Sequence, residues 1–383
     1  DMAQRLAAVA RAGQAGLLVK KNLVSKNAVI LDHNPAGYKI GVSIVTDYFA
    51  HPCMNALMPK IVKLPSYSLK IGSTFVSKDS VAFFPLNKED VSFHISRHEL
   101  EELMIREWEI PVLRERVKSV DLARKIVVTD KNEYKVARQI IDCSGPAMVV
   151  ARSVKDVAPL WPVYSTWTYF DIAGSDTGKF WDSIRSRGAK YLRYSDLRTP
   201  GKLEPMKTDD SWDPLNTTML TQLREGMWTW QIPLHRGKLL SFGAVSRHGE
   251  ISEAELLEIA RTQCGPNYPL TARPLDPSSP YNRLHVRNNF AQKASTAATR
   301  DYILVADAFC FADPIYSVGV ALAANEGIEV ASLLNEGDGW NDEKCKTYCA
   351  KYEALIGRAV TAFNYWYSGA LVADGAAADE VQK

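Results

Sequence analysis

The sequence has no apolar run near the roughly 20 residues that a membrane-spanning helix needs, and its N-terminus lacks the basic-then-apolar pattern of a signal peptide. It also has little net charge, +2 over 383 residues. A charge this small gives no electrostatic reason for the chain to bind nucleic acid or a membrane surface. We therefore expect a cytoplasmic protein with neither partner.

Cysteines are few and scattered, at Cys53, Cys143, Cys264, Cys310, Cys345 and Cys349. None of them takes part in the C-x-x-C or Cys/His spacing of a metal site, so no metal is expected. Cys345 and Cys349 are four residues apart on a predicted helix. This spacing more often means two free thiols on one helix face than a disulfide bond. Internal repeats and low-complexity linkers are also missing. The cysteine pattern agrees with the cytosol as the compartment.

What the sequence contains is ordinary for a globular protein, with 46% hydrophobic and 23% charged residues. Its length allows one large domain or two intimate ones. The first 32 residues have the pattern of a β-α-β unit. Residues 5–10 and 28–32 are apolar enough for buried strands, and residues 17–25 favour a helix between them.

The turn after the first predicted strand resembles a dinucleotide fingerprint. Gly13 and Gly16 stand at its second and third glycines, and Asp32 ends the second strand, where an acceptor for ribose hydroxyls is expected. Arg11 stands at the first glycine. It either strains a turn that needs positive φ or lies along a pyrophosphate. A β-α-β unit with small residues for packing alone is the alternative interpretation.

The remaining pattern predicts strands interleaved with helices, while residues 37–90 are mixed and irregular. Strands are expected at 117–121, 125–129, 139–143, 163–170, 190–194, 226–232, 239–245 and 302–306, and helices at 97–108, 252–263, from 318 onward and within 340–370. The last dozen residues are expected to be disordered. The order favours a discontinuous cofactor domain with a sheet domain inserted into it. The predicted divisions are 1–160 and 285–335 for the cofactor domain, 161–284 for the inserted sheet, and 336–383 for a C-terminal helical region.

Two segments narrow this fold to one kind of chemistry. The first is Trp228-Thr-Trp-Gln-Ile-Pro233 and the second is Phe311-Ala-Asp-Pro-Ile-Tyr-Ser-Val-Gly319. Tryptophans at i and i+2 share one side of a strand, and the proline fixes the exit of that strand. A core strand with bulky residues would explain the first segment alone. The pair, in this order, resembles the flavin-dependent halogenase family, related to flavoproteins of the p-hydroxybenzoate-hydroxylase type. The resemblance runs from about Arg5 to about Asn335.

This resemblance implies an α/β fold: an FAD-binding, Rossmann-like domain of the p-hydroxybenzoate-hydroxylase or glutathione-reductase type, an inserted mixed β-sheet domain for substrate, and short C-terminal helices. It assigns FAD to Arg11, Gly13, Gly16, Asp32, Arg97, Asp307 and Pro314. Asp307 lies in Val305-Ala-Asp-Ala, where the family has Gly-Asp-Ala and the aspartate binds the sugar-alcohol chain of the flavin. Gly41-Val-Ser43 stands where the family has Gly-Glu-Ser. The departures at Arg11, Val42 and Ala306 leave open a chain that has lost flavin binding.

The resemblance also implies the reaction. In the family, reduced flavin and oxygen oxidise a halide, and hypohalous acid travels through a tunnel to a lysine beside the substrate. Lys70, in Lys70-Ile-Gly-Ser-Thr-Phe75, matches that lysine. Such a lysine must be desolvated and reachable. A surface lysine is the alternative interpretation. The other catalytic assignments are Trp228, Trp230 and Pro233, where the two indoles would sit beside the flavin and keep organic substrate away from it.

The second motif also implies the binding of halide and substrate. Backbone N–H groups of Ser317, Val318 and Gly319, at the turn into a helix, make an anion site suited to chloride or bromide. Tyr316 resembles the aromatic residue of phenol- and pyrrole-type members, which makes tryptophan a less expected substrate. Tyr365 and Trp366 would line a substrate pocket, or else form the packed face of a helix.

The leading hypothesis is therefore an FAD-dependent halogenase of secondary metabolite biosynthesis. Its partners would be a separate flavin reductase and an electron-rich aromatic substrate, free or tethered to a carrier protein. A flavin monooxygenase of the same family, hydroxylating an aromatic or a protein side chain, is the first alternative. The second is a non-redox relative that uses the fold for binding.

Overall fold

The computed structural model describes residues 5–10, 13–24, 28–35, 37–45, 51–70, 72–76, 81–85, 92–172, 217–264, 278–337 and 339–368. Packing divides the chain into two compact units, and the chain enters each of them three times. Unit 1 comprises Asp1–Lys39, Arg97–Leu160 and Phe290–Val360, and unit 2 comprises Ile40–Ser96, Trp161–Asn289 and Thr361–Lys383.

Unit 1 is built on a mainly parallel sheet. Its strands are β1 (Arg5–Ala10), β2 (Ala28–Leu31), β8 (Val112–Leu113), β9 (Val117–Asp121), β10 (Ile126–Thr129), β11 (Glu133–Asp142) and β19 (Tyr302–Leu304). Their order is β8-β2-β1-β11-β10-β9, with β19 also paired to β11. β2, β1, β11 and β19 run parallel, whereas β9 and β10 form an antiparallel hairpin beside the start of β11. The predicted hairpin and parallel strand are thus confirmed.

The N-terminal β-α-β unit is also confirmed. β1 and β2 pair in parallel from Ala7 opposite Ala28 to Ala10 opposite Leu31. The helix between them, α1, spans Gln14–Asn22 and buries Leu17, Leu18 and Val19. This geometry places the start of α1 and the end of β2 at the carboxyl edge of the sheet, where ligands of open α/β sheets bind.

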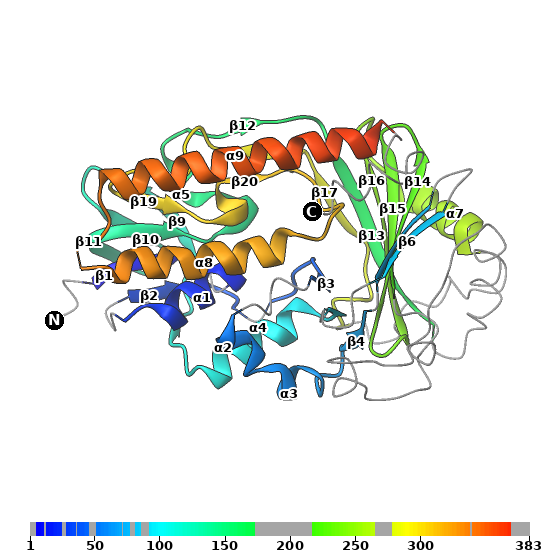
Figure 1. The fold of residues 1–383 in the computed structure, drawn as a ribbon, viewed down its shortest axis with the longest axis horizontal. Helices are drawn as coiled ribbons and strands as arrows, with labels where there is room; N and C mark the ends of the chain where they lie inside the picture. Colours follow the sequence, from blue (N-terminus) through cyan, green and yellow to red (C-terminus); the bar gives the residue numbers. More distant parts are fainter. Residues whose placement is uncertain are drawn as a thin grey trace. The chain divides into compact units, whose positions relative to one another are not determined.

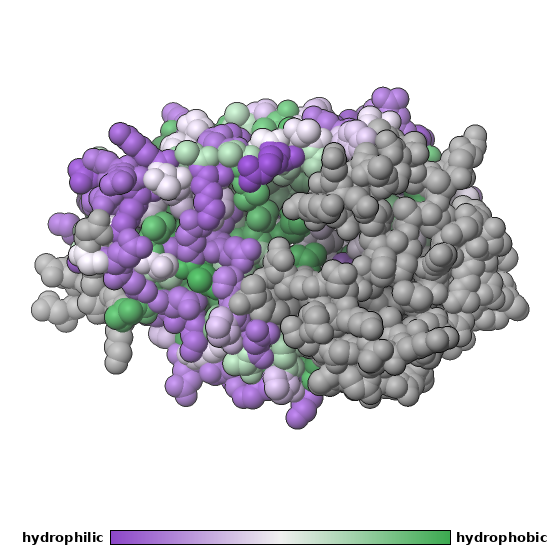
Figure 2. Space-filling model, viewed as in Figure 1, coloured by the Kyte–Doolittle hydropathy of each residue, from purple (hydrophilic) through white to green (hydrophobic). Residues whose placement is uncertain are grey.

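Helices cover the sheet of unit 1. They are α1, α4 (Arg97–Glu107), α5 (Val149–Ser153), α8 (Gly319–Asn335) and α9 (Asp342–Tyr367), with 3-10 turns η2 (Gly145–Ala147) and η6 (Ala306–Ala308) and a small sheet of β12 (Ala158–Pro159), β18 (Gln292–Lys293) and β20 (Cys310–Phe311). α8 and the first part of α9 lie side by side (Figure 1), joined where Tyr352 and Lys351 meet Glu329. On the face seen in Figure 2, hydrophilic residues gather on the left, where α8 ends and α9 begins, and hydrophobic residues show in the middle of the view.

Unit 2 is built on a seven-stranded sheet in the order β17-β13-β16-β15-β14-β5-β6. The strands are β5 (Gly72–Val76), β6 (Val81–Pro85), β13 (Tyr164–Asp171), β14 (Thr217–Arg224), β15 (Met227–Leu234), β16 (Leu239–Ser246) and β17 (His285–Asn288). Helix α7 (Glu253–Cys264) lies on one face of this sheet (Figure 1), where Leu256 and Ala260 join a core with Phe170 and Phe242.

Unit 2 also contains a second, small sheet in the order β3-β7-β4. Its strands are β3 (Ser43–Ile44), β4 (Ser68–Leu69) and β7 (Phe93–His94), and two short helices, α2 (Pro52–Asn55) and α3 (Met58–Ile61), complete the unit. His94 is the central position of this sheet, opposite Ser43 on one side and Ser68 on the other. The sheet therefore brings residues 43, 68 and 94 together although they are distant in sequence.

The structure divides the chain differently from the prediction in two places. Residues 40–96 were predicted to belong to the cofactor domain. They belong to unit 2 instead, because β5 pairs with β14 of the large sheet. The expected short C-terminal helices are one helix of 26 residues, α9, which contributes to both units. The predicted strand at 190–194 and the tail expected to be disordered lie outside the described residues. Within those described, no helix is both long and apolar enough to span a membrane.

Candidate functional site

The start of α1 has no side-chain cap. Gly13 is the N-cap, and because glycine has no side chain, no side-chain hydrogen bond caps the first turn. A Cβ at Gly13 would lie 4.0 Å from Nη2 of Arg97, the only atom it would approach within that distance. The unpaired N–H groups and positive end of a helix dipole favour an anion here. Arg97 therefore adds a cation at the place where the fingerprint predicts a pyrophosphate. Arg11 lies outside the described residues.

Arg97 is held by Glu101, a residue that the motifs did not identify. Glu101 is fully buried and accepts hydrogen bonds from Arg97 Nη2 at 2.9 Å and from Gln14 Nε2 at 3.4 Å. It also forms an ion pair with Lys39. One buried carboxylate thus meets two cations and links α4 to the first turn of α1. The two cations and the one carboxylate of this cluster leave one positive charge, which suits a diphosphate.

Asp32 ends β2 in the predicted position. It is 3% exposed, and its Oδ1 accepts a hydrogen bond of 3.0 Å from the backbone N–H of Asn34. A buried carboxylate at the carboxyl end of the second parallel strand is the acceptor that a ribose needs. The turn that follows thus helps to orient this carboxylate, and Nδ1 of His33 lies 3.7 Å from the same oxygen.

Asp307 lies in the 3-10 turn η6, close in space to the first residue of α8. Its Oδ1 is 3.9 Å from the position that a Cβ on Gly319 would occupy, and its Cβ is 3.9 Å from the Cβ position of Gly145. Gly145 has φ of +62°, a conformation that favours glycine. Val318 is the N-cap of α8 and makes no side-chain cap, so this helix also presents free N–H groups. Asp307 and the two glycines thus form a second polar corner of unit 1.

Ala306 has left-handed backbone geometry, with φ of +54°. This is the position at which the family has glycine. Its N–H donates to Oε2 of Glu326 at 2.6 Å, and Glu326 is buried within α8. Burial raises the pKa of Glu326 to about 8. Alanine in place of the motif glycine therefore keeps the left-handed turn, at the cost of backbone strain.

We expect Ala306→Gly to stabilise the protein by about 0.5–1 kcal/mol. The left-handed conformation costs a residue with a Cβ roughly 1–2 kcal/mol, and the greater freedom of glycine in the unfolded chain offsets part of the gain. Urea unfolding would measure it. The matched control is Ala323→Gly inside α8, which should cost about 1 kcal/mol. Equal destabilisation by both changes would show that residue 306 is unstrained.

Of the three backbone N–H groups predicted to bind halide, the structure leaves two available. Ser317 has φ of +56°, and its N–H donates to the carbonyl of Pro314 at 3.0 Å. That amide is therefore committed to the turn 314–317. Val318 and Gly319 begin α8, so their N–H groups are the ones that helix geometry leaves available for an anion. Tyr316 is half-buried, and burial raises the pKa of its phenol.

The lysine predicted to be catalytic is buried in unit 2. Lys70 follows β4 and is 4% exposed. Its Nζ donates to Oγ of Ser43 at 3.1 Å, and no carboxylate pairs with it among the described residues. Burial lowers the pKa of Lys70 to about 8. A desolvated lysine without a counter-ion is costly in a protein, and such groups cluster at functional sites.

The two tryptophans of the first motif lie together in β15. Their rings are 5.9 Å apart, and both are buried. Nε1 of Trp228 donates to the hydroxyl of Tyr367 at 3.0 Å, and Nε1 of Trp230 donates to Oγ of Ser241 at 3.1 Å. Pro233 is a buried position of the same strand. Both indoles are thus fixed by packing and by a hydrogen bond.

The C-terminal residues expected near substrate pack on unit 2. Trp366 is fully buried and meets the ring of Phe75 edge-on at 5.4 Å, while Tyr365 is partly exposed. Tyr367, by contrast, binds Trp228 directly and lies 3.6 Å from the guanidinium of Arg247. The end of α9 therefore packs against the tryptophan motif and holds Trp228 by a hydrogen bond.

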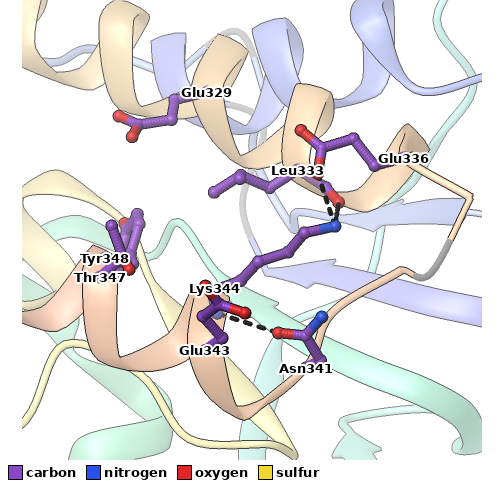
Figure 3. Close-up of a pocket in the computed structure, with 8 residues that line it drawn as sticks. All are labelled: Glu329, Leu333, Glu336, Asn341, Glu343, Lys344, Thr347 and Tyr348. Atoms are coloured by element: carbon purple, nitrogen blue, oxygen red, sulfur yellow. Dashed lines mark hydrogen bonds and ion pairs between the residues drawn. The ribbon is translucent and has the colours of Figure 1, made fainter.

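A separate hollow of about 270 Å³ lies in unit 1 between the end of α8 and the start of α9 (Figure 3). Lys344 reaches across it to the carbonyls of Leu333 and Gly339 and to the carboxylate of Glu336. A lysine on the last carbonyls of a helix is a C-terminal cap. None of the predicted site residues lines this hollow, so we assign it a structural role.

No protein-family model matches the chain. Two curated proteins match it in part. The flavin-dependent halogenase gsfI of Penicillium aethiopicum is 27% identical over 135 residues, 32% of this chain and 24% of that protein. The flavin-dependent halogenase rdc2 of Metacordyceps chlamydosporia is 29% identical over 147 residues, 36% of this chain and 27% of that protein. The match thus spans about a quarter of the length of these relatives.

Solved structures resemble the chain over nearly all of its length. A flavoprotein/dehydrogenase from Cytophaga hutchinsonii has a TM-score of 0.69 at 18% identity, over 96% of this chain and 87% of that one. The flavin-dependent brominase Bmp2 has a TM-score of 0.69 at 15% identity, over 99% and 92%. A variant of the halogenase PltM in complex with FAD has a TM-score of 0.64 at 16% identity, over 94% and 76%. At such identities the likeness concerns the fold. The chain therefore has the α/β fold of FAD-dependent flavoproteins, and its resemblance to flavin-dependent halogenases is confirmed in sequence over about a third of its length.

Proposed function

We propose that the protein is an FAD-dependent halogenase that uses reduced FAD, oxygen and halide to halogenate an electron-rich aromatic such as a phenol or pyrrole, free or carrier-tethered. Reduced FAD would come from a separate flavin reductase. The observation that carries the proposal is Lys70, a buried lysine with a lowered pKa and no carboxylate partner among the described residues. It stands at the position that the halogenase motif assigns to the reactive lysine.

Unit 1 supplies the residues that suit FAD. We propose that it is a Rossmann-like FAD domain of the p-hydroxybenzoate-hydroxylase type, with unit 2 as the substrate domain. Arg97 and the open turn at Gly13 would hold the pyrophosphate, Asp32 the adenosine ribose, and Asp307 the sugar-alcohol chain. The bound cofactor would supply the oxidation of halide by oxygen. The start of α8 at Val318 and Gly319 would hold the halide.

Unit 2 supplies the residues that act on the halogen and the substrate. Lys70 would deliver the halogen electrophile, by a hydrogen bond or as a haloamine. The bulk of Trp228 and Trp230 would keep organic substrate from the oxidant, which disfavours direct hydroxylation. Tyr316, which belongs to unit 1, would favour phenol- and pyrrole-type substrates over tryptophan. A monooxygenase of the same fold remains the second candidate, because the likeness to solved structures concerns the fold and does not distinguish the two reactions.

Titration of the apoprotein with FAD tests whether the redox proposal holds at all. We expect binding with a flavin absorption spectrum, and weaker binding by Arg97→Met, because the diphosphate loses a charge-assisted hydrogen bond worth roughly 1.5–3 kcal/mol. The matched control is Arg124→Met, at a well-exposed arginine of unit 1. If neither the wild type nor Arg97→Met bound FAD, the non-redox alternative would replace the proposal.

Stability against pH tests the burial of Lys70. The pKa of this lysine is about 8 in the folded protein against a usual 10.5. Below pH 8 both states carry the proton, and the folded state bears the cost of the buried charge. Between pH 8 and 10.5 the unfolded state binds more protons, so stability rises with pH by about 3 kcal/mol in total.

Lys70→Met lacks this titration, so the free energy of unfolding of the wild type relative to Lys70→Met should rise by that amount between pH 7.5 and 10.5. Urea unfolding of both proteins at a series of pH values would measure the difference, in which the other titrating groups cancel. A difference that does not change with pH would show that Lys70 is solvated.

A further inference from the structure

A buried chain of polar side chains extends from Lys70 through three other elements of unit 2. Lys70 Nζ donates to Ser43 Oγ at 3.1 Å, Ser43 Oγ lies 3.2 Å from Thr218 Oγ1, and Thr218 Oγ1 lies 2.7 Å from Nε2 of His94. All four side chains are at most 4% exposed. The small sheet brings Ser43 opposite His94, and β14 of the large sheet adds Thr218.

The chemistry of the groups fixes the direction of the first hydrogen bond, and the tautomer of His94 decides the other two. An ammonium has only donors, so Ser43 accepts from Lys70. Thr218 has one hydroxyl proton to share between Ser43 and His94. If Nε2 of His94 accepts that proton, Ser43 can donate to Thr218, and every bond then runs from Lys70 towards His94. This requires a neutral His94 that carries its proton on Nδ1.

The surroundings of His94 favour that form. Burial and the nearby charge of Lys70 lower the pKa of His94 well below its usual value, so the ring is neutral at pH 7. The carbonyl of Pro233 opposes this effect in part, although Nδ1 makes no hydrogen bond of good geometry among the described residues. Proline has no N–H, so its backbone can only accept at this ring. Lys70 and His94 are the titratable groups here, since no described carboxylate shifts the pKa of either.

We propose that His94 is a positioning residue for Lys70: acting through Thr218 and Ser43, its Nε2 lone pair keeps the Ser43 oxygen turned towards the ammonium. This inference rests on the proposed function of Lys70. One N–H of the ammonium is thereby anchored, and the remaining two keep a fixed direction towards the reacting halogen. The chain takes the place of a carboxylate, which would bind the lysine more tightly and hold it charged.

Two single variants break the chain at different points, and a third preserves it. His94→Leu removes the terminal acceptor, Thr218→Val removes a hydroxyl at nearly constant shape, and His94→Gln keeps an acceptor within reach of Thr218. The matched control is Thr74→Val, which removes one hydroxyl of the neighbouring buried pair Thr74–Thr217, 3.0 Å apart and outside the chain. We expect His94→Leu and Thr218→Val each to lower kcat by about 100-fold with KM unchanged, because the reactive group is misdirected rather than lost.

The double variant His94→Leu/Thr218→Val should lose no more than either single one, since both break the same chain. His94→Gln should recover most of the rate, and Thr74→Val should retain it. Undiminished kcat in Thr218→Val, or an equal loss in Thr74→Val, would overturn the inference, because the hydroxyls would then serve only packing.

A second measurement needs no activity. An oriented acceptor stabilises the charged lysine, so breaking the chain should lower the pKa of Lys70 by about one unit. Each protein is compared with the same protein that also carries Lys70→Met, and the pH at which the protein with Lys70 begins to gain stability is recorded. This pH should be lower in the His94→Leu and Thr218→Val backgrounds than in the wild type. It should be unchanged in the Thr74→Val background. If the wild type proves not to halogenate, the proposed function fails while this measurement still decides the inference. If this pH were the same in His94→Leu and Thr218→Val as in the wild type, the inference would be overturned.

Discussion

Lys70→Ala should abolish halogenated product while leaving the consumption of reduced FAD and oxygen intact. In the proposed function unit 1 would bind FAD, whereas the lysine that would position the electrophile belongs to unit 2, so the two activities should separate. Losing a positioned reactive group costs several orders of magnitude, since effective molarity accounts for up to roughly 7–11 kcal/mol of a barrier. Product formation and oxygen uptake, followed side by side in both proteins, would measure the separation.

The matched control for this variant is Lys63→Ala, an exposed lysine of the same segment. It should retain the full rate. Lys70→Ala should not destabilise the fold at pH 7, because no buried carboxylate loses its partner and a buried charge is removed. Undiminished halogenation by Lys70→Ala would show that the burial of this lysine serves another purpose.

Gly327→Ala should destabilise unit 1 and weaken FAD binding together. A Cβ at Gly327 would lie 2.7 Å from the carbonyl oxygen of Ala15 and 3.2 Å from its Cα, so α8 would have to move away from α1. Forced overpacking of backbone costs about 1–3 kcal/mol. Both helices begin at the proposed cofactor site, so their separation would also displace the N–H groups that face the phosphates.

The control for this variant is Gly357→Ala in α9, where a Cβ would meet no atom within 4 Å. Alanine is the better helix former by about 1 kcal/mol, so this change should stabilise the protein. The difference between the two Gly→Ala variants isolates the contact between α1 and α8. Urea midpoints and FAD titrations of both variants would establish it. Equal stabilisation by both would mean that the helices are not in close contact.

Much of unit 1 could be predicted because its signals are local. The apolar runs at 5–10 and 28–32, with glycines between them, give a parallel β-α-β unit by pattern alone. The place of residues 40–96 could not be predicted in this way. β5 pairs with β14 across more than 140 residues of sequence, and the strands of the small sheet have only two residues each. Such pairings leave no periodicity to detect.

The site divides in the same manner. Lys70 and the tryptophans were predicted because they stand in motifs. Glu101 was not, because its role comes from Arg97 and Lys39 meeting one buried carboxylate, and nothing in the sequence pattern shows which glutamate of α4 faces inward beyond its spacing of four from Arg97. His94 was missed because its partners Ser43 and Thr218 are 51 and 124 residues away. Polar chains built from separate strands become visible only once the strands are paired.

The measurement that tests the central claim most directly is the mass spectrum of the product formed with FAD, a flavin reductase, oxygen and a panel of phenols and pyrroles, with bromide present or absent. The proposed function predicts a brominated product, with the isotope doublet of bromine, that forms only when bromide is present and disappears in Lys70→Ala. A hydroxylated product that forms equally with and without bromide would contradict it and identify the protein as a monooxygenase.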